Sequence, residues 1–418
     1  MKILFKNARI LTMKNPDIFV GDLLVVDNRI AYIGKNASAY SPFDRVVECN
    51  GNLLMPGFKN AHAHSAMVFL RGKAEAANLQ EWLFDIVFPR EAKLQPEDIY
   101  HLNKLAYLEY VSRGITMCYE HYFFPDSSAK AAREFGFRTL LLGTYDPVKM
   151  SVSQLVNKWH LYNDKKDDLV TYSIGFHAEY TSDEEMVKKT KEALDIVKAP
   201  FYTHISETNK EVEECIARHG CSPVKYLASN GLFNYGGGGY HCVHFSKEDI
   251  AIFKKFNMNV VSCPGSNQKL GSGVAPIKEF LDAGLNVALG TDGPASNDTL
   301  DMFHEMYLLA TLADHQIPAY EVLKMATVNA AHAMSMYDAD VLDVDKYADI
   351  IMIKLDNGNE DIFDQLVYHG DSNNVMLTMI NGQILYEDNK FFLKESVEDI
   401  YNKVNQVIER LEKDVLGE

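Results

Sequence analysis

The chain has 418 residues, of which 47% are hydrophobic and 24% are charged. This length can bury a large core and favours a barrel with an accessory module over one small domain. The formal net charge is −17, and no long Lys/Arg run interrupts the acidic composition. Because nucleic-acid binding needs a basic surface, no nucleic-acid partner is expected.

The first residues, MKILFKNARILTMKNPD, mix charged and apolar positions and lack the continuous apolar stretch of a signal peptide. No apolar run approaches membrane-spanning length. The six cysteines are scattered without CxxC spacing, which argues against a disulfide framework and against a thiolate zinc site. A cytoplasmic protein with reduced cysteines and no membrane partner is expected.

The predicted elements change character along the chain. Residues 1–55 contain short alternating strands separated by turn residues, so they predict a small β-module. Over residues 56–345, short apolar runs alternate with amphipathic helical stretches, which is typical of parallel strands joined by crossover helices. Strand patterns return over 346–395, and residues 396–418 predict a final amphipathic helix.

The central region holds eight apolar runs, each followed by a helical stretch. Eight such units predict an α/β fold, a (β/α)8 TIM barrel. Both chain ends, 1–55 and 346–395, are predicted to form one β-sandwich domain beside it. The eight runs lie at residues 55–64, 115–122, 137–146, 170–180, 199–207, 240–245, 258–264 and 286–293.

Polar residues break these runs mostly at their C-terminal ends, which form the active-site mouth of a TIM barrel. His62 and His64 close the first run, and their i, i+2 spacing on a strand points both imidazoles to one face. His204 closes the fifth run, His241 falls in the sixth, and Asp292 closes the eighth. Imidazoles and a carboxylate form a site suited to Zn²⁺ or Fe²⁺, with room for a water.

Such an ion lowers the pKa of its water toward neutrality, which makes a nucleophile. Glu207 follows His204 by three residues and leaves the strand on the same side, where it could move a proton from the water to a ring nitrogen.

Each candidate has a structural alternative. An H-x-H pattern alone is weak evidence for a metal. Asp292 could cap the following helix, His241 and His244 could be core or rim residues, and for His244 that interpretation is preferred. His177 and Glu179 could belong to a hydrogen-bonded loop. Chance explains each residue singly but explains poorly several strand ends that all carry ligand-type residues.

Three further features have more than one interpretation. The run Gly236 to Gly239 has no GK[ST] and no following helix, so a flexible entry to the sixth strand is expected rather than a phosphate site. Trp82 is as compatible with the core as with a substrate pocket. Arg138 begins the third run, and a guanidinium buried there needs a carboxylate or a ligand hydroxyl as partner.

The combination of PGFKNAHAHSAM, LRG with LQEWL, THISE, HCVH, SCPGSN with KLGSG, and LGTDGPASN resembles the amidohydrolase superfamily, in the branch of 5′-methylthioadenosine/S-adenosylhomocysteine deaminases and related chlorohydrolases. The resemblance implies one metal held by His62, His64, His204 and Asp292. It implies Glu207 as proton shuttle, His241 as the residue that orients the attacking hydroxide, and Asp292 as acceptor of its proton.

The same resemblance implies substrate contacts from Glu91 to ribose hydroxyls, from Arg138 and His177, and from Trp82 as an aromatic wall. The chain departs from the family pattern around His177, where Phe176 and Glu179 replace the expected residues. A second arginine expected after the third strand has only Lys149 as a counterpart. The charged tail of S-adenosylhomocysteine is therefore the least supported ligand group.

The first functional hypothesis is metal-dependent hydrolytic deamination of an adenosine-type nucleoside, namely methylthioadenosine, S-adenosylhomocysteine, adenosine or 5′-deoxyadenosine. The second keeps one divalent metal, Zn²⁺ or Fe²⁺, and changes the substrate to guanine, a pterin or an s-triazine, because fold does not fix function. The third is a catalytically silent binding protein, disfavoured because metal ligands, shuttle and orienting histidine are all present. A homo-oligomer is expected from the resemblance.

Overall fold

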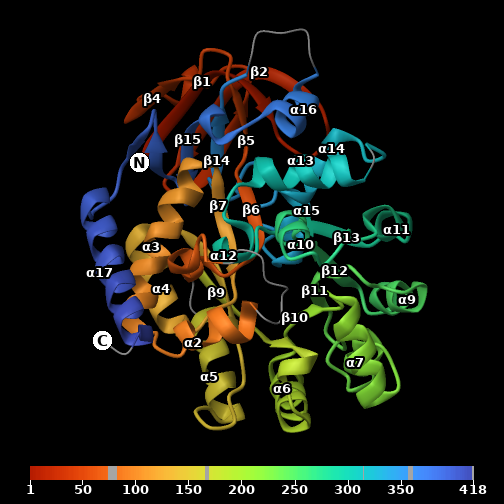
Figure 1. Cartoon of the computed structure of the whole chain (residues 1–418). Coiled ribbons are helices and arrows are strands. Elements are labelled where there is room, and N and C mark those ends of the chain that lie inside the picture. Colours follow the sequence, from red (N-terminus) through yellow and green to blue (C-terminus); the bar gives the residue numbers. More distant parts are fainter. Residues whose placement is uncertain (74–81, 165–168, 314, 356–360, 417–418) are drawn as a thin grey trace.

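The computed structural model describes the chain except residues 74–81, 165–168, 314, 356–360 and 417–418. Its centre is an eight-stranded parallel sheet in sequential order, so the predicted barrel is confirmed (Figure 1). The strands are β6 (Phe58–Ala63), β7 (Ile115–Glu120), β8 (Arg138–Gly143), β9 (Val170–Ala178), β10 (Phe201–Ile205), β11 (Gly237–His241), β12 (Met258–Ser262) and β13 (Asn286–Leu289).

The last strand comes back to the first at the carboxyl ends of the barrel. The Asp292 backbone N–H donates to the carbonyl of His62 at 3.0 Å, and Ala63 and Asp292 form a parallel bridge. Residues from the two ends of the barrel region of the sequence thereby lie side by side at the mouth of the barrel.

Helices surround the strands (Figure 1). Several begin at a Ser, Thr or Asp whose side chain accepts a hydrogen bond from the first turn, for example Ser151, Asp183 and Thr208. The longer helices are α3 (Pro96–Ser112), α4 (Pro125–Phe135), α5 (Val152–Asn163), α6 (Glu184–Val197), α7 (Asn209–His219), α8 (Pro223–Ser229), α9 (Lys247–Lys255), α13 (Met302–Leu312) and α14 (Ala319–Met325). Shorter helices after strands are η2 (Ser65–Leu70), η3 (Trp82–Val87), α2 (Phe88–Glu91), η4 (Glu179–Thr181), α10 (Pro264–Lys269), α11 (Ile277–Asp282), α12 (Pro294–Asn297) and α15 (Val328–Ala333).

Both chain ends contribute to one nine-stranded mixed sheet, ordered β17-β16-β15-β14-β5-β1-β2-β3 with β4 paired to β1. It encloses a core of its own that includes Phe5, Leu23, Ile350 and Leu377, so the predicted β-domain from both ends is present. Its strands are β1 (Lys2–Leu11), β2 (Ile18–Val26), β3 (Arg29–Gly34), β4 (Arg45–Glu48), β5 (Leu53–Pro56), β14 (Ile350–Ile353), β15 (Val375–Ile380), β16 (Gln383–Glu387) and β17 (Lys390–Phe391); short helices η1 (Ser38–Tyr40), α16 (Ile362–Asp364), η5 (Gln365–His369) and η6 (Ser372–Asn374) complete this part.

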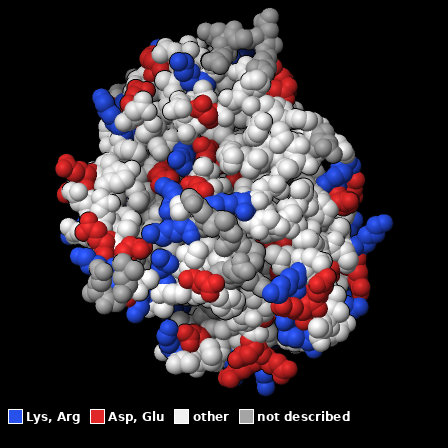
Figure 2. Space-filling model, in the orientation of Figure 1, with Lys and Arg blue, Asp and Glu red and all other residues white. Residues whose placement is uncertain are grey.

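The predicted C-terminal helix is α17 (Val397–Leu416), which packs along α3 (Figure 1). Its buried residues Ile400, Val404, Val407 and Leu411 follow the three-to-four-residue spacing of a helix face. Figure 2 shows basic and acidic side chains next to one another on this side of the molecule. Among the described residues, no helix is both long and apolar enough to cross a membrane.

The glycine run differs from its prediction as a flexible entry, because Gly237 to Gly239 lie within β11 itself. A Cβ at Gly237 would stand 1.8 Å from the carbonyl oxygen of Phe201, and φ is +134° there. The missing side chains allow close approach of β10 and β11, and β10 carries His204.

Gly237→Ala is expected to lower the free energy of unfolding by on the order of 2–4 kcal/mol, because it combines an unfavourable φ with an overpacked strand pair. Chemical denaturation measures this. Gly220→Ala is the control, since φ is +72° there and nothing lies within 4 Å of the new Cβ. Equal losses in both variants would show that strand packing at Gly237 contributes nothing.

Candidate functional site

Four side chains meet at the mouth of the barrel with the spacing of metal ligands. The Nε2 atoms of His62 and His64 each lie 3.2 Å from Asp292 Oδ1, and His64 Nε2 lies 3.2 Å from His204 Nε2. Donors about 2.0–2.1 Å from a zinc ion in a tetrahedron would be about 3.3–3.4 Å apart. The predicted set therefore fits one divalent ion.

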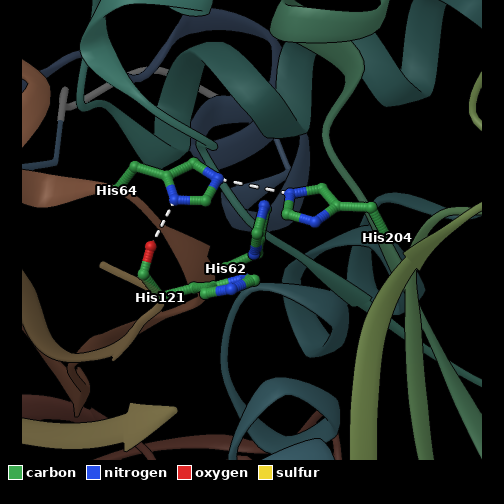
Figure 3. A group of neighbouring side chains, drawn as sticks. All are labelled: His62, His64, His121 and His204. Atoms are coloured by element: carbon green, nitrogen blue, oxygen red, sulfur yellow. Dashed lines mark hydrogen bonds between the residues drawn. The ribbon is translucent and has the colours of Figure 1, made fainter. Parts of the chain in front are cut away.

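Hydrogen bonds to residues outside this group orient the rings of the candidate ligands (Figure 3). His64 Nδ1 contacts the carbonyl of His121, and His204 Nδ1 contacts the carbonyl of His177 at 2.7 Å. His62 is fully buried, and neither of its ring nitrogens has a hydrogen-bond partner among the described residues. Burial lowers the pKa of His62 to about 3, so it is a neutral imidazole, the form that binds metals.

The three predicted catalytic side chains border the same point. Glu207 and His241 are 5% and 1% exposed, and Glu207 Oε2 lies 3.8 Å from His241 Nε2. Burial, with the charge of Asp292, raises the pKa of Glu207. Ser206, His241 and Asp292 have φ of +50°, +69° and +60°, backbone conformations that non-glycine residues adopt rarely and that cluster at functional sites.

A single segment after β12, residues 263–273 and called here the β12 loop, contacts all three predicted catalytic side chains. Ser266 Oγ donates to Asp292 Oδ2 at 2.6 Å, and Asn267 Oδ1 lies 2.8 Å from His241 Nδ1. Ser272 Oγ donates to Glu207 Oε1 at 3.0 Å. With its Nδ1 held by Asn267, His241 presents Nε2 to the site.

Two other residues complete this support. Ser296 Oγ donates to Asp292 Oδ2 at 2.7 Å, so that oxygen is occupied while Oδ1 faces His62 and His64. Burial alone would raise the pKa of Asp292, but the close contacts of its carboxylate with the imidazoles of His62 and His64 outweigh burial and hold the pKa well below its usual range. Glu211 accepts the backbone N–H groups of Ser206 and Glu207 at 2.7 and 2.8 Å, which fixes the start of the Glu207 segment.

Asn267→Ala is expected to lower kcat about 10–100-fold with little change in KM, a usual cost of losing a partner that orients a site histidine. Asn267→Asp should restore much of the rate and shift its pH dependence, because a carboxylate favours protonated His241. Steady-state kinetics across pH measure both. An unchanged kcat in Asn267→Ala would show that His241 needs no orientation, and the exposed Asn230 supplies the control substitution.

The candidate metal group opens into a cavity of about 640 Å³. Besides Glu207 and Asp292, the predicted substrate residues Trp82, Glu91 and His177 line it. Glu91 Oε1 accepts the hydroxyl of Tyr122 at 2.5 Å, and burial raises the pKa of Glu91. Trp82 is 3% exposed, and its Nε1 has no hydrogen-bond partner among the described residues. The residue thus belongs to the core and to the cavity wall.

Known proteins are similar to this chain over most of its length. Residues 53–385 match the amidohydrolase family. A 5-methylthioadenosine/S-adenosylhomocysteine deaminase of Thermoanaerobacter pseudethanolicus is 35% identical over 425 residues, covering 96% of this chain and 97% of the relative. The chain belongs to the amidohydrolase family. This amidohydrolase is accordingly a hydrolase, and its relatives support action on C–N bonds of cyclic amidines.

Solved structures resemble this amidohydrolase along almost its full length. An adenosine deaminase of Xanthomonas campestris with bound zinc has a TM-score of 0.90 at 27% identity and covers 98% of each chain. The atrazine chlorohydrolase of Arthrobacter aurescens complexed with zinc has a TM-score of 0.86 at 23% identity, covering 97% of this chain and 100% of its own. The second likeness concerns the fold alone.

The structure corrects one predicted substrate contact of the amidohydrolase, Arg138. This residue opens β8 at the amino end of the barrel, away from the cavity, and is 1% exposed. Its Nε and a terminal nitrogen bond both oxygens of Asp349 at 2.6 and 2.9 Å, and its guanidinium lies over the ring of Tyr347. The partner that a buried guanidinium requires is a carboxylate of the second domain rather than a ligand.

The structure also shows where Glu179 and Lys149 lie. Glu179 is buried and pairs with Arg218 and His219, so it holds η4 to α7. Lys149 lines the outer part of the cavity. His244 Nε2 bonds the carbonyl of Ser272 at 2.8 Å, in line with its expected role as a rim residue.

Sequence reasoning missed His121, which belongs with His62, His64 and His204 to a group whose donor atoms all lie within 4.8 Å of one another. A signal was available, because His121 directly follows the apolar run that forms β7, in the position that singled out the other ligands. The serines of the β12 loop and Glu211 carry no such signal, since Ser and Glu are common at helix starts.

Proposed function

We propose that this protein is a zinc-dependent hydrolytic deaminase of adenosine-type nucleosides, which it converts to the inosine product and ammonia. The observation that carries the proposal is the convergence of Glu207, His241 and Asp292 on a His/Asp metal group at the floor of a large cavity. Three histidines and one carboxylate suit Zn²⁺, with Fe²⁺ as the alternative. The deaminase relative at 35% identity supports the same reaction.

When bound, the ion would lower the pKa of a water toward neutrality. Glu207 is placed to take a proton from that water and to pass it to a nitrogen of the purine ring. His241 Nε2 orients the attacking oxygen, because Asn267 fixes the ring through Nδ1. Asp292 keeps one oxygen toward the site and has its other oxygen held by Ser266 and Ser296, so it can accept the second proton without turning.

The cavity wall fits a nucleoside. Glu91 and Tyr122 form a pair of oxygen groups suited to ribose hydroxyls, and Trp82 offers an aromatic surface with an indole N–H that has no partner in the described part of the chain. His177 lies beside His204, with ring centroids 4.6 Å apart, and burial lowers its pKa to about 4. It therefore faces the substrate as a neutral hydrogen-bonding group.

The alternative is the same chemistry on guanine, a pterin or an s-triazine. The full-length likeness to a chlorohydrolase fold makes this worth a direct test, because addition of water and departure of a leaving group need the same floor residues whichever ring is bound.

The test is a substrate panel on zinc-loaded protein, with release of ammonia or chloride and the mass of the heterocyclic product as readouts. Methylthioadenosine, S-adenosylhomocysteine, adenosine and 5′-deoxyadenosine are compared with guanine, a pterin and a chlorinated s-triazine. Turnover of the adenosines supports the proposal and ranks the 5′ groups. Turnover of another ring alone overturns the substrate class, and no turnover in the metal-replete protein leaves a binding role.

A further inference from the structure

The candidate metal group has two flanking histidines, and only one of them is explained by the proposed reaction. His241 shares a donor group with His62, His204 and Asp292, whereas His121 shares another with His62, His64 and His204. The Nδ1 of His241 is occupied by Asn267. The Nδ1 of His121 is buried and has no hydrogen-bond partner among the described residues.

The backbone of His121 fixes its ring against the ligands. Its N–H donates to the carbonyl of Ala63 at 2.9 Å, and its carbonyl oxygen contacts His64 Nδ1. Both bonds join the first residue after β7 to the His62–His64 segment of β6. The position of the imidazole beside the ligands therefore follows from the strand pairing itself.

The ring lies within the cluster and faces the other imidazoles (Figure 3). Its centroid is 5.2 Å from that of His204 and 5.4 Å from that of His64. The side chain is only 9% exposed. A buried imidazole whose Nδ1 has no partner among the described residues, and which is surrounded by other imidazoles, has the properties of a metal ligand.

We propose that His121 is a fifth protein ligand of the metal, in addition to His62, His64, His204 and Asp292. Donor atoms on opposite sides of an ion with bonds of about 2.1 Å are about 4.2 Å apart. The donor atoms of the four histidines lie within 4.8 Å of one another, which is close to this spacing. Together with the water of the proposed function, the ion would then have six ligands.

The inference rests on the metal site of the proposed function and has its own readouts. Apo-protein is titrated with Zn²⁺ and with Co²⁺, and the visible absorption of the Co²⁺ form reports the coordination number. His121→Ala is expected to lower Zn²⁺ affinity about 10–100-fold, in the range of other changes at metal sites, and to strengthen the Co²⁺ absorption as one ligand is lost. His121→Asn, whose amide can reach the position of Nδ1, should restore part of the affinity.

His177→Ala is the matched control. His177 also lies beside His204 and is half-buried, but its Nδ1 bonds Thr181 at 3.0 Å and it lies outside the donor group. Its substitution should leave Zn²⁺ affinity unchanged. His64→Ala is the positive reference and should lose most of the affinity.

X-ray absorption of the zinc-loaded wild-type protein gives an answer that no folding defect can obscure. Four coordinated imidazoles support the proposal, and three overturn it. Unchanged affinity and Co²⁺ spectrum in His121→Ala, with a raised KM, would assign His121 to the substrate instead. If His64→Ala also binds zinc normally, or the wild-type protein binds no ion, the metal site of the proposed function fails together with this inference.

Discussion

Glu207→Gln is expected to lower kcat by about 10²–10⁴-fold, the contribution of a positioned acid–base group. The amide keeps the shape of the side chain and can still contact Ser272, but it cannot carry a proton. Zinc affinity should change little, since Glu207 lies outside both candidate donor groups. Initial rates on the best substrate of the panel, together with the zinc content of the purified variant, measure both effects.

The pH dependence of the wild-type rate gives a second check on Glu207. Because burial raises the pKa of this carboxyl, it becomes protonated at a higher pH than an exposed glutamate. A shuttle must start unprotonated, so kcat/KM should fall on acidification with a midpoint above the usual carboxyl range. Glu214→Gln, on the exposed side of α7, should leave the rate and its pH profile unchanged. Full activity in Glu207→Gln would assign the proton transfer to another group.

Arg138→Met is expected to lower the free energy of unfolding by about 3–5 kcal/mol, because it leaves the carboxylate of Asp349 buried without its charge partner. The two side chains are 1% and 0% exposed, so water cannot replace the guanidinium. Chemical denaturation and the rate of thermal inactivation measure the loss.

The same variant tests whether Arg138 contacts the substrate. Arg138 begins β8, and the first residue of this strand that lines the cavity is Leu142 near its other end, about 13 Å further at the rise of a strand. KM and kcat of the folded variant should therefore stay near wild type. Lys278→Met, which removes an exposed i,i+4 pair with Asp282, should cost about 0–1 kcal/mol. A raised KM with normal stability in Arg138→Met would return this arginine to the substrate site.

Most of the fold could be predicted from the sequence, because each barrel strand is a separate apolar run bounded by turns and helices. The β11 strand was the exception in detail. Its first residues, Gly237 to Gly239, carry no side chain, so hydrophobic patterning begins only at Tyr240. Strand pairing with β10, rather than propensity, determines where β11 starts.

The candidate ligands could be predicted because parallel strands end at one rim of the barrel. A residue at the C-terminal end of its apolar run is therefore expected at this rim. That reasoning does not extend to pairs formed at the other end of the barrel. Arg138 and Asp349 are separated by 211 residues, and nothing in either local pattern points to the other. The contacts of Ser266, Asn267 and Ser272 depend on how one loop folds over the site, which residue types alone do not specify.

The β12 loop has a further consequence for how substrate range can change. It holds the three predicted catalytic side chains, whereas Trp82, Glu91 and Tyr122 approach the cavity from segments after β6 and β7. In the proposed function, reaction and recognition thus depend on different segments of the rim. A mutant library confined to the segments after β6 and β7, with His64 and His121 kept, should yield variants with new ring preferences that retain the proton path, which makes this chain a suitable starting point for directed evolution.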